Sequence, residues 1–399
     1  MTVSAVGAMS ALRTAGAPRT VRRSGFTIAA DGSYAACLAE TVLPEEGLGG
    51  GLLAERWTLG GPEPYAVPLP GAQPEEPGTQ VLPLTDGRVL IRRRVADRHD
   101  LALLYPSGPD TGSLAVGSLI GADVRLLPPA PGGCAYALAY DEDGDQTGVW
   151  RVHGTSGGLP EPVMAVPGRC TGGVWLDRAG RLLAVDRELD GRTKAVAADL
   201  HTGRTSPLLQ ITDDSDDRLL LSEPDSGLLL LRSDATGEAR LGWGVLGSRL
   251  PVRFPDALRV PGVLLTPVAA QPGQILTPEA SVVALRAEVP GGAESLALWR
   301  PGERRLHWRA SPPGWLGAAG MWLPRDELRL PYAEGDHLCG LAAYDPPASW
   351  PERRTAAAGV VVHGQARALP ALPARPALPA LPARREWCVL PLQQAPLAG

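Results

Sequence analysis

The hydrophobic positions of this chain fall in short runs that are separated by glycine, proline and aspartate. A small or acidic turn is followed by an apolar run, as in DGRVLIRRRV from Asp86 and AGRLLAVDRE from Ala179. Glycine and aspartate in such turns supply the positive φ that tight hairpins need. Helical periodicity is absent, because 48 glycines and 41 prolines interrupt every candidate run before it reaches helix length. The pattern predicts an all-β chain.

This unit of turn and strand recurs seven times at nearly constant spacing. The second turn residues of successive units lie 55, 46, 47, 47, 53 and 47 positions apart. In chain order, these residues are Gly32, Gly87, Gly133, Gly180, Gly227, Ala280 and Glu327. A fixed period of this length is the sequence signature of a repeat architecture.

Each unit carries further strands around the turn. One precedes it, as in GGVWL, and two more follow downstream, as in AVAADL from Ala195 and LPVRF from Leu250. Four strands in a unit of about 47 residues match the blade of a β-propeller. We therefore predict a seven-bladed β-propeller of four-stranded antiparallel blades. The alternatives are a β-sandwich or two small barrels, neither of which requires seven copies of one unit.

The repeats divide the chain into four expected parts. These are an N-terminal extension at 1–18, the propeller at 19–354, a linker rich in Pro, Ala and Leu at 355–385, and a strand within 386–399 that closes the ring. The linker has a low-complexity sequence that favours extended, polyproline-like structure. The seventh repeat lacks an outer strand. We expect EWCVLPL in the last part, or the N-terminal segment 19–28, to supply it.

The amino-acid composition limits which binding partners and which cellular compartment are expected. A net charge of −5 and a pI near 5.8 argue against a nucleic-acid or anionic-membrane surface. The five cysteines are odd in number and form no Cys-x-x-Cys pair, which is typical of a reduced, cytoplasmic protein. No apolar run approaches the length of a membrane helix. Lys194 is the single lysine beside 37 arginines, a bias that indicates a GC-rich genome such as that of an actinobacterium.

The repeat resembles the TolB-like and WD40-like propeller unit, and most closely the propeller domain of prolyl oligopeptidase-family enzymes. Residues Ala179–Ile211 carry the likeness best, and it extends over about residues 20 to 350. In that family a separate α/β-hydrolase domain carries the catalytic Ser, Asp and His, and this sequence has no segment resembling it. A literal G-x-S-x-G at Gly154–Gly158 follows a strand but precedes LPEPVMAV instead of a helix, so a nucleophile role is not predicted there. The chain is not expected to be a serine peptidase.

Metal and cofactor signals are weak. Asp141, Asp143 and Asp145 alternate as in a calcium loop, but glycine falls at loop position four and Val152 at position twelve. A solvated hairpin turn explains them equally well, and the acidic loop 213–217 also fits a solvated surface. The six histidines have no paired ligand spacing. The sequence therefore predicts no metal and no cofactor.

Candidate ligand-binding residues come from the expected geometry of the ring. Loops leading into the innermost strands share one face with the hairpins between second and third strands, and ligands commonly bind there. Arg93, Asp186 and Arg286 are charged residues six positions after their turns, within otherwise apolar strands. They are candidates to face a ligand, or alternatively to form ion pairs between blades.

Aromatic residues give a second set of candidates. Trp175 and Trp322 fall on predicted innermost strands, and Trp315 lies near the start of the seventh repeat. The three could form an aromatic wall at the mouth of the channel, or alternatively pack in the cores between blades.

Two functional hypotheses follow. The first is a propeller that binds a small molecule in its central channel, extended to a non-hydrolytic enzyme (a cyclase, lyase or isomerase) of specialised metabolism. The second is a non-catalytic scaffold that binds a protein partner through its broad loop faces. A truncated peptidase relative ranks third. A pocket of several hundred cubic ångströms with convergent polar groups would favour the first hypothesis, and an exposed apolar face beside a plugged channel the second.

Overall fold

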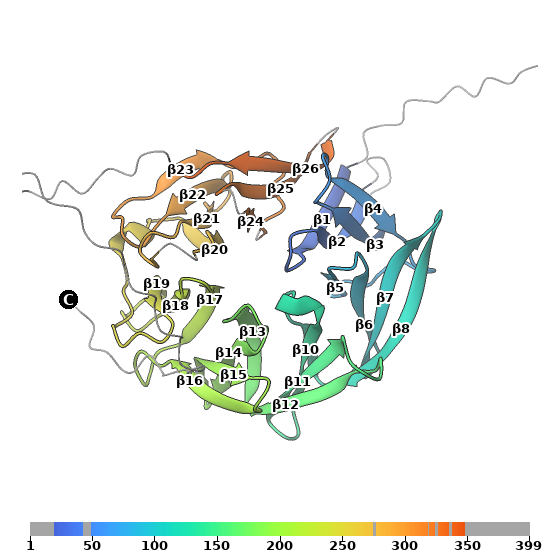
Figure 1. Cartoon of the computed structure of the whole chain (residues 1–399), viewed down its shortest axis with the longest axis horizontal. Coiled ribbons are helices and arrows are strands. Elements are labelled where there is room, and N and C mark those ends of the chain that lie inside the picture. Colours follow the sequence, from blue (N-terminus) through green and yellow to red (C-terminus); the bar gives the residue numbers. More distant parts are fainter. Residues whose placement is uncertain are drawn as a thin grey trace, which may run out of the picture.

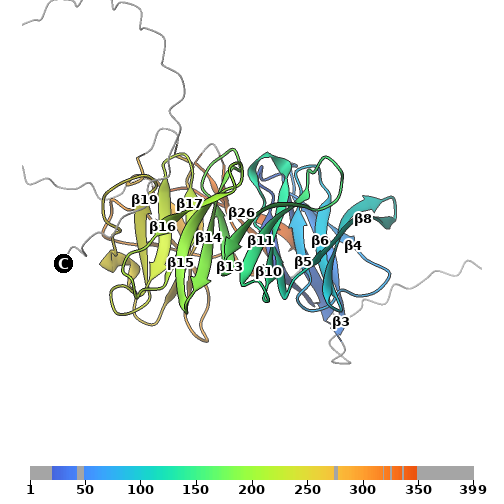
Figure 2. The same cartoon turned by 90° about the horizontal axis from the view of Figure 1, so that it is seen from below.

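The structure is a computed structural model that describes residues 20–42, 49–273, 277–317, 319–323, 326–334 and 337–347. Within them the secondary structure consists of β-strands and two short 3-10 turns, at Pro131–Gly133 and Asp256–Leu258, and turns and loops connect the strands. Figure 1 shows the strands arranged as radial sheets around one axis, and Figure 2 shows the ring edge-on as a flat disc. The predicted all-β propeller of antiparallel sheets is confirmed, and most of these sheets have the expected four strands among the described residues.

The first four blades each have four strands that follow one another from the axis outward. Blade 1 consists of β1 (Thr20–Ile28), β2 (Tyr34–Val42), β3 (Gly49–Thr58) and β4 (Tyr65–Leu69). Blade 2 consists of β5 (Gln80–Pro83), β6 (Val89–Val95), β7 (Arg98–Ser107) and β8 (Asp110–Ile120). Blade 3 consists of β9 (Asp123–Leu126), β10 (Ala135–Asp141), β11 (Gln146–His153) and β12 (Glu161–Pro167). Blade 4 consists of β13 (Arg169–Trp175), β14 (Leu182–Leu189), β15 (Arg192–Asp199) and β16 (Arg204–Leu209).

The remaining strands form three further antiparallel groups. Blade 5 consists of β17 (Asp217–Glu223), β18 (Leu228–Ser233) and β19 (Arg240–Val245). Blade 6 consists of β20 (Leu264–Ala270), β21 (Val283–Glu288), β22 (Ser295–Trp299) and β23 (His307–Ala310). Blade 7 consists of β24 (Met321–Trp322), β25 (Leu328–Glu334) and β26 (His337–Tyr344). In blade 5 the expected outer strand is reduced to one bridge, between Trp243 and Arg253.

The core is divided among the junctions between blades. Successive residues of a strand point to opposite faces, so alternate side chains pack against the preceding and the following blade. In β18, Leu229 and Leu231 pack toward blade 4, whereas Leu228 and Leu230 pack toward blade 6. The described residues contain seven such apolar clusters, one at each junction around the ring. This two-sided burial explains why the second strands read as continuous apolar runs.

The ring closes where blade 7 packs on blade 1. Phe26 and Trp57 of blade 1 share an apolar cluster with Ala319, and Met321 and Leu341 of blade 7 pack against it. The segment 19–28 was one of two candidates for the outer strand of blade 7, and this candidate is wrong. Its residues form β1, which pairs with β2 of its own blade because this register stacks Phe26 edge-on to Trp57, with ring centroids 4.9 Å apart. The expected extension at 1–18, the linker at 355–385 and the strand within 386–399 lie outside the described residues.

The repeating turn between the first and second strands of a blade, here called the inner turn, touches the inner turn of its neighbour. Gly180, in the inner turn of blade 4, has a φ of +67°. A Cβ atom there would lie 2.9 Å from the carbonyl oxygen of Pro131 in the inner turn of blade 3. Glycine is thus required twice over at Gly180, for its backbone conformation and for the close approach of two blades.

Substituting Gly180 with alanine is expected to destabilise the ring by about 2–3 kcal/mol, because the left-handed strain and a backbone clash add together. Gly191 is a matched control: its φ is +73°, and a Cβ there meets nothing within 4 Å. Gly191→Ala should therefore cost only about 1 kcal/mol. Urea unfolding of both variants measures the difference, and equal losses would show that the contact between turns does not matter.

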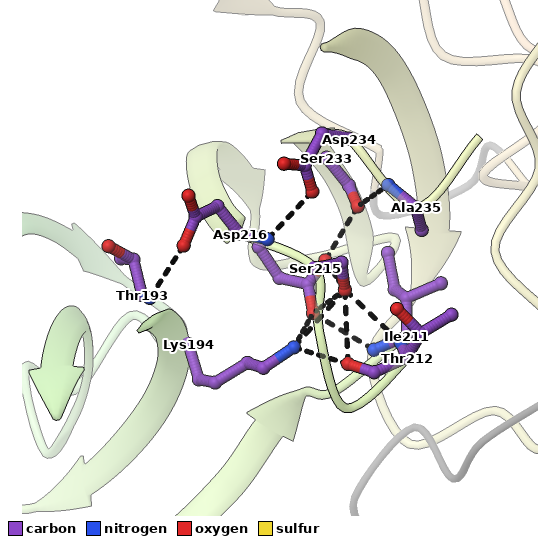
Figure 3. Close-up of polar contacts among 10 residues, drawn as sticks. Thr193, Lys194, Ile211, Thr212, Ser215, Asp216, Ser233, Asp234 and Ala235 are labelled. Carbon is purple, nitrogen blue, oxygen red and sulfur yellow. Dashed lines mark hydrogen bonds and ion pairs between the residues drawn. The ribbon is translucent and has the colours of Figure 1, made fainter. Parts of the chain in front are cut away.

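A buried polar network joins blades 4 and 5 (Figure 3). The Lys194 Nζ atom on β15 lies 3.0 Å from the Asp217 carboxylate on β17 and donates to the Ser215 hydroxyl at 3.1 Å and to the Thr212 carbonyl. The hydroxyls of Ser215 and Ser233 donate to the same carboxylate, at 2.9 and 2.6 Å. Asp217 is fully buried. The two strands also share one parallel bridge at Lys194 and Asp217, so this pair, here called the Lys194–Asp217 pair, fixes the junction.

Candidate functional site

The inner turns of five blades meet around one cavity of about 990 Å³, here called the channel mouth. Turns from blades 1, 4, 5, 6 and 7 lie far apart in sequence and can meet only at the axis of the ring (Figure 1). The lining combines apolar and charged side chains. Its main members are Ile28, Asp31, Arg178, Asp225, Met321, Trp322, Leu323 and Asp326.

An arginine spans two inner turns on one side of the channel mouth. Arg178 of blade 4 donates from Nε and Nη2 to the two oxygens of Asp225 in blade 5, at 3.0 and 2.8 Å. The Nη2 atom also reaches Glu223, at 3.3 Å, and that carboxylate is held by the Ser226 backbone N–H at 2.7 Å. The hydrogen bonds to Asp225 raise the pKa of Arg178, so the guanidinium stays charged. The side chain remains 59% exposed and is therefore fixed in direction yet open to a ligand.

The opposite side of the channel mouth is formed by blades 6, 7 and 1. The Gln271 Nε2 atom donates to the Asp326 carboxylate at 2.7 Å, which joins the inner turns of blades 6 and 7. Asp31 of blade 1 accepts from the Ser33 hydroxyl at 2.6 Å. Trp322 lies between these turns and is 91% buried, since only 9% of it is exposed. Its indole N–H has no hydrogen-bond partner among the described residues.

This arrangement suits binding of a small molecule more directly than proton transfer. Concave sites lined by apolar side chains and a few fixed polar groups are typical of ligand pockets. Arg178 offers a permanent cation that is held by two carboxylates, and Met321 and Trp322 offer apolar contact. Among the lining residues described, Arg178 has a shifted pKa, and the shift favours its charged form. Such a group orients a ligand rather than exchanging protons with it.

The three candidate tryptophans are placed differently. Trp322 lines the channel mouth at the end of β24, on the predicted innermost strand. Trp175 also lies on an innermost strand, but its indole N–H donates to the Pro128 carbonyl at 3.0 Å, and the side chain packs in the core between blades 3 and 4. Trp315 packs between blades 6 and 7 and donates to the Ala319 carbonyl at 3.2 Å. Trp315 and Trp322 thus share one core cluster between blades 6 and 7, whereas Trp175 belongs to another, so the structure does not bring the three indoles together.

Arg93 and Arg286 both lie in ion pairs away from the channel mouth. The Arg93 guanidinium donates to both oxygens of Glu75 at 2.8 and 2.7 Å, which raises the pKa of the arginine. Glu75 belongs to the connection between blades 1 and 2. Arg286 pairs with Glu294, and with Glu288 at 3.0 Å, within its own blade.

Asp186 lies in the junction between blades 4 and 5. Its carboxylate accepts a hydrogen bond from the Leu219 backbone N–H at 3.0 Å and lies 3.9 Å from the Arg218 guanidinium. Burial raises its pKa to about 6, and the contacts with Leu219 and Arg218 oppose that rise only in part. The three charged candidates are thus spread over three blades, and none of them lines the channel mouth.

The remaining sequence motifs occupy hairpins. Ser156 of the G-x-S-x-G sequence lies in the turn between β11 and β12, and its hydroxyl donates to Glu161 at 3.3 Å. Asp145 lies in the turn between β10 and β11, where it accepts from the Tyr140 hydroxyl at 3.0 Å. The described residues contain no group of three or more acidic, histidine or cysteine side chains arranged to hold a metal. None of their helices is long and apolar enough to span a membrane.

Sequence reasoning missed Arg178, Asp225, Gln271 and Asp326. The repeat period offered a signal for the first pair: Arg178 and Asp225 are 47 positions apart, which is one period, so they occupy equivalent inner turns of adjacent blades. Opposite charges one period apart therefore predict contacts between blades. Gln271 and Asp326 carry no such signal, because their separation of 55 residues includes an irregular inner turn in blade 6.

Several solved protein structures have a fold similar to that of this chain, at low sequence identity. No protein-family model matches the sequence, and neither does any curated protein. The β-propeller domain of the Trilobed protease from Pyrococcus furiosus has 12% identity and a TM-score of 0.50, over 82% of this chain and 95% of that one. A puromycin-hydrolyzing peptidase from Mycobacterium tuberculosis has 15% identity and a TM-score of 0.50, over 82% of this chain and 52% of that one.

This chain spans about half the length of the mycobacterial peptidase. TolB from Acinetobacter baumannii is also similar, with 12% identity and a TM-score of 0.41, over 82% of this chain and 80% of that one. At these identities the likeness shows the fold alone. The chain is a β-propeller that resembles the propeller domains of prolyl oligopeptidase-type peptidases.

Proposed function

We propose that this propeller binds a small molecule at the channel mouth. The observation that carries the proposal is the convergence of five inner turns on one cavity of about 990 Å³ with a mixed apolar and charged lining. A volume of this order holds a drug-sized ligand. Arg178 would donate to an oxygen of the ligand, while Met321 and Trp322 contact its apolar part. Asp31 and Asp326 lie opposite Arg178 and can accept from hydroxyl or amine groups.

The ring determines how such a ligand would be held. Each charged lining group is fixed by a partner in the protein, so little side-chain entropy is lost on binding. A non-hydrolytic enzyme, such as a cyclase, lyase or isomerase, is the more specific form of the proposal, and it would use the same fixed groups to orient a reactive conformer. The four cysteines among the described residues are free thiols, which supports a cytoplasmic setting. A role in specialised metabolism of an actinobacterium remains a prediction from the sequence.

A protein-binding scaffold is the second candidate, and the outer strand of blade 2 favours it. Leu114 and Ile120 on β8 are 53% and 83% exposed. β8 begins with Asp110 and has a β-bulge between Ala115 and Gly117. From Thr111 to Ile120, however, it contains no proline and no charge, whereas β4, β12, β16 and β23 each contain one or the other. Proline and charge are the usual protection of a free sheet edge against pairing with another chain. An extended segment of a partner could therefore add to β8.

Filling the channel mouth distinguishes the two functions. Ala30 is exposed and lines the cavity, so Ala30→Trp should block it without disturbing the core. Ala115→Trp places the same side chain at an exposed position of β8 and serves as the control. Ligand-observed NMR with a panel of neutral, cationic and anionic fragments should give hits that lose at least about tenfold in affinity in the first variant and keep it in the second. If no fragment distinguishes the two variants, the channel mouth is not a ligand site.

A further inference from the structure

A second cavity, of about 760 Å³, lies between blades 5 and 6. It is formed by the hairpin between β18 and β19 and by the connection from Asp256 to Leu264, which leads into β20. Antiparallel strands place these two segments at the end of the blades opposite to the inner turns. The cavity is thus separate from the channel mouth. Its lining includes three arginines, here called the arginine cleft: Arg232, Arg240 and Arg259.

Arg232 occupies an unusual position for a charged residue. It follows four leucines on β18, on the same face as Leu228 and Leu230, which form the core between blades 5 and 6. The guanidinium is half-buried, and its Nη2 atom donates to the Leu265 carbonyl of blade 6 at 2.9 Å. That bond uses one of the five N–H donors of the group. No carboxylate among the described residues forms an ion pair with Arg232, and burial alone lowers its pKa.

The two other arginines at the cleft already have partners, but exposed ones. Arg240 pairs with Asp256 at 3.1 Å, and Arg259 pairs with Glu238 at 2.7 Å. Asp256 is 98% exposed, and the Arg259–Glu238 pair is also largely in solvent, so both pairs contribute little free energy. Three cations and two anions leave the cleft with one uncompensated positive charge, at Arg232, which alone of the three forms no ion pair among the described residues.

We propose that the arginine cleft binds an organic oxyanion, a carboxylate or a phosphate ester, with Arg232 as its main ligand. A half-buried cation without an anion is unfavourable, and a bound oxyanion would supply the missing charge. The planar guanidinium fork presents parallel N–H groups that match two oxygens of either anion. Leu258, Val263 and Leu265 line the same cavity and would contact the carbon part of the ligand. Arg259, whose side chain is 61% exposed, can turn from Glu238 toward the ligand, and Arg240 adds its charge to the same lining.

The test is calorimetric titration of the whole chain with inorganic phosphate and, separately, with succinate, in sodium chloride of matched ionic strength. Binding of one or both probes is expected, and the tighter one identifies the chemical class of the anion. Arg232→Met keeps the length and apolar packing of the side chain but removes the charge, and should weaken binding at least about tenfold. Arg204→Met, at an exposed position on β16, is the matched control and should bind as the unchanged protein does.

Arg259→Met provides a second variant that does not depend on the core, because its side chain is 61% exposed. It should weaken binding about threefold, as expected for a rim charge. Absence of binding for both probes, or equal affinity in the unchanged protein and in Arg232→Met, would overturn the proposal. Channel-mouth variants such as Ala30→Trp should leave the titration unchanged, so this result is independent of the function proposed above.

Discussion

Replacing Lys194 with methionine is expected to lower the free energy of unfolding by about 3–5 kcal/mol, because it leaves a fully buried carboxylate without its cation. Asp217 would retain hydrogen bonds from Ser215, Ser233 and the Ile211 backbone N–H, the last at 2.9 Å. These bonds do not replace the lost charge. The strands that the Lys194–Asp217 pair joins, β15 and β17, share a single backbone bridge, so side chains carry much of this contact.

Urea unfolding followed by tryptophan fluorescence measures this loss. Arg98→Met is the matched control, because the Arg98–Asp100 pair has a similar N–O distance of 2.9 Å but side chains that are 54% and 39% exposed. That substitution should cost less than about 1 kcal/mol. If both methionine variants lost the same small amount, the buried pair would contribute nothing to the junction. Lys194 is also the single lysine of the chain, so acylation located at this residue by peptide mass spectrometry reports on opening between blades 4 and 5.

Asp186→Asn is expected to make the protein more stable at neutral pH, by up to about 3 kcal/mol. Burial raises the pKa of Asp186 to about 6 from the ordinary value of 3.8. A raised pKa in the folded state means that the folded protein binds the proton more tightly than the unfolded chain does. The contribution of Asp186 to stability is therefore fully present below pH 4 and is lost as the pH rises through 6. Asparagine retains an oxygen to accept the Leu219 N–H and carries no charge.

The measurement is the free energy of unfolding of both proteins at intervals from pH 4 to pH 7. The two curves should agree near pH 4 and separate as Asp186 ionises in the unchanged protein. Asp100→Asn is a control on an exposed carboxylate, and its curve should run parallel to that of the unchanged protein. A difference between Asp186→Asn and the unchanged protein that is constant over this range would exclude titration of Asp186 as the cause.

The fold could be predicted because each repeat contains its own turn glycine and its own apolar strand, and the conformation of both is determined by nearby residues. Positive φ at Gly87, Gly133 and Gly180 is a property of each turn alone, and the turn fixes where the next strand begins. The two-faced apolar strands, such as Leu228–Leu231, likewise follow from burial on both sides of a blade. The irregular parts were less predictable, because one bridge at Arg253 replaces the expected outer strand of blade 5. There, tertiary packing decides how much of the strand forms.

The site was less predictable because the channel mouth lies at the inner turns. This is the end of the blades opposite to the loops and hairpins where the sequence analysis expected a ligand, so Arg93, Asp186 and Arg286 were sought at the other end of the strands. The sequence marked Asp186 and Arg286 as charged residues in apolar strands, but not which of their two faces would hold a partner. Asp186 accepts a hydrogen bond from Leu219, and Arg286 forms an ion pair with Glu288, so both interact with other residues of this chain away from the channel mouth. Arg178 lies in a turn, where charge is unremarkable, and its importance comes from Asp225 one period away. Periodic comparison of charges could have found it, whereas the volume of the cavity could not be read from the sequence.

The placement of β1 in blade 1 has a mechanical consequence. Six of the seven junctions are crossed by the chain itself, so separating those blades pulls on a covalent connection. Within the described residues, the junction between blades 7 and 1 is held by side chains such as Phe26, Trp57 and Leu341 alone. Among the described residues, this is therefore the one junction that no covalent connection of the chain crosses. Under load or heat the junction between blades 7 and 1 should separate first. Backbone amide protons at this junction should therefore exchange faster than those at the other six junctions.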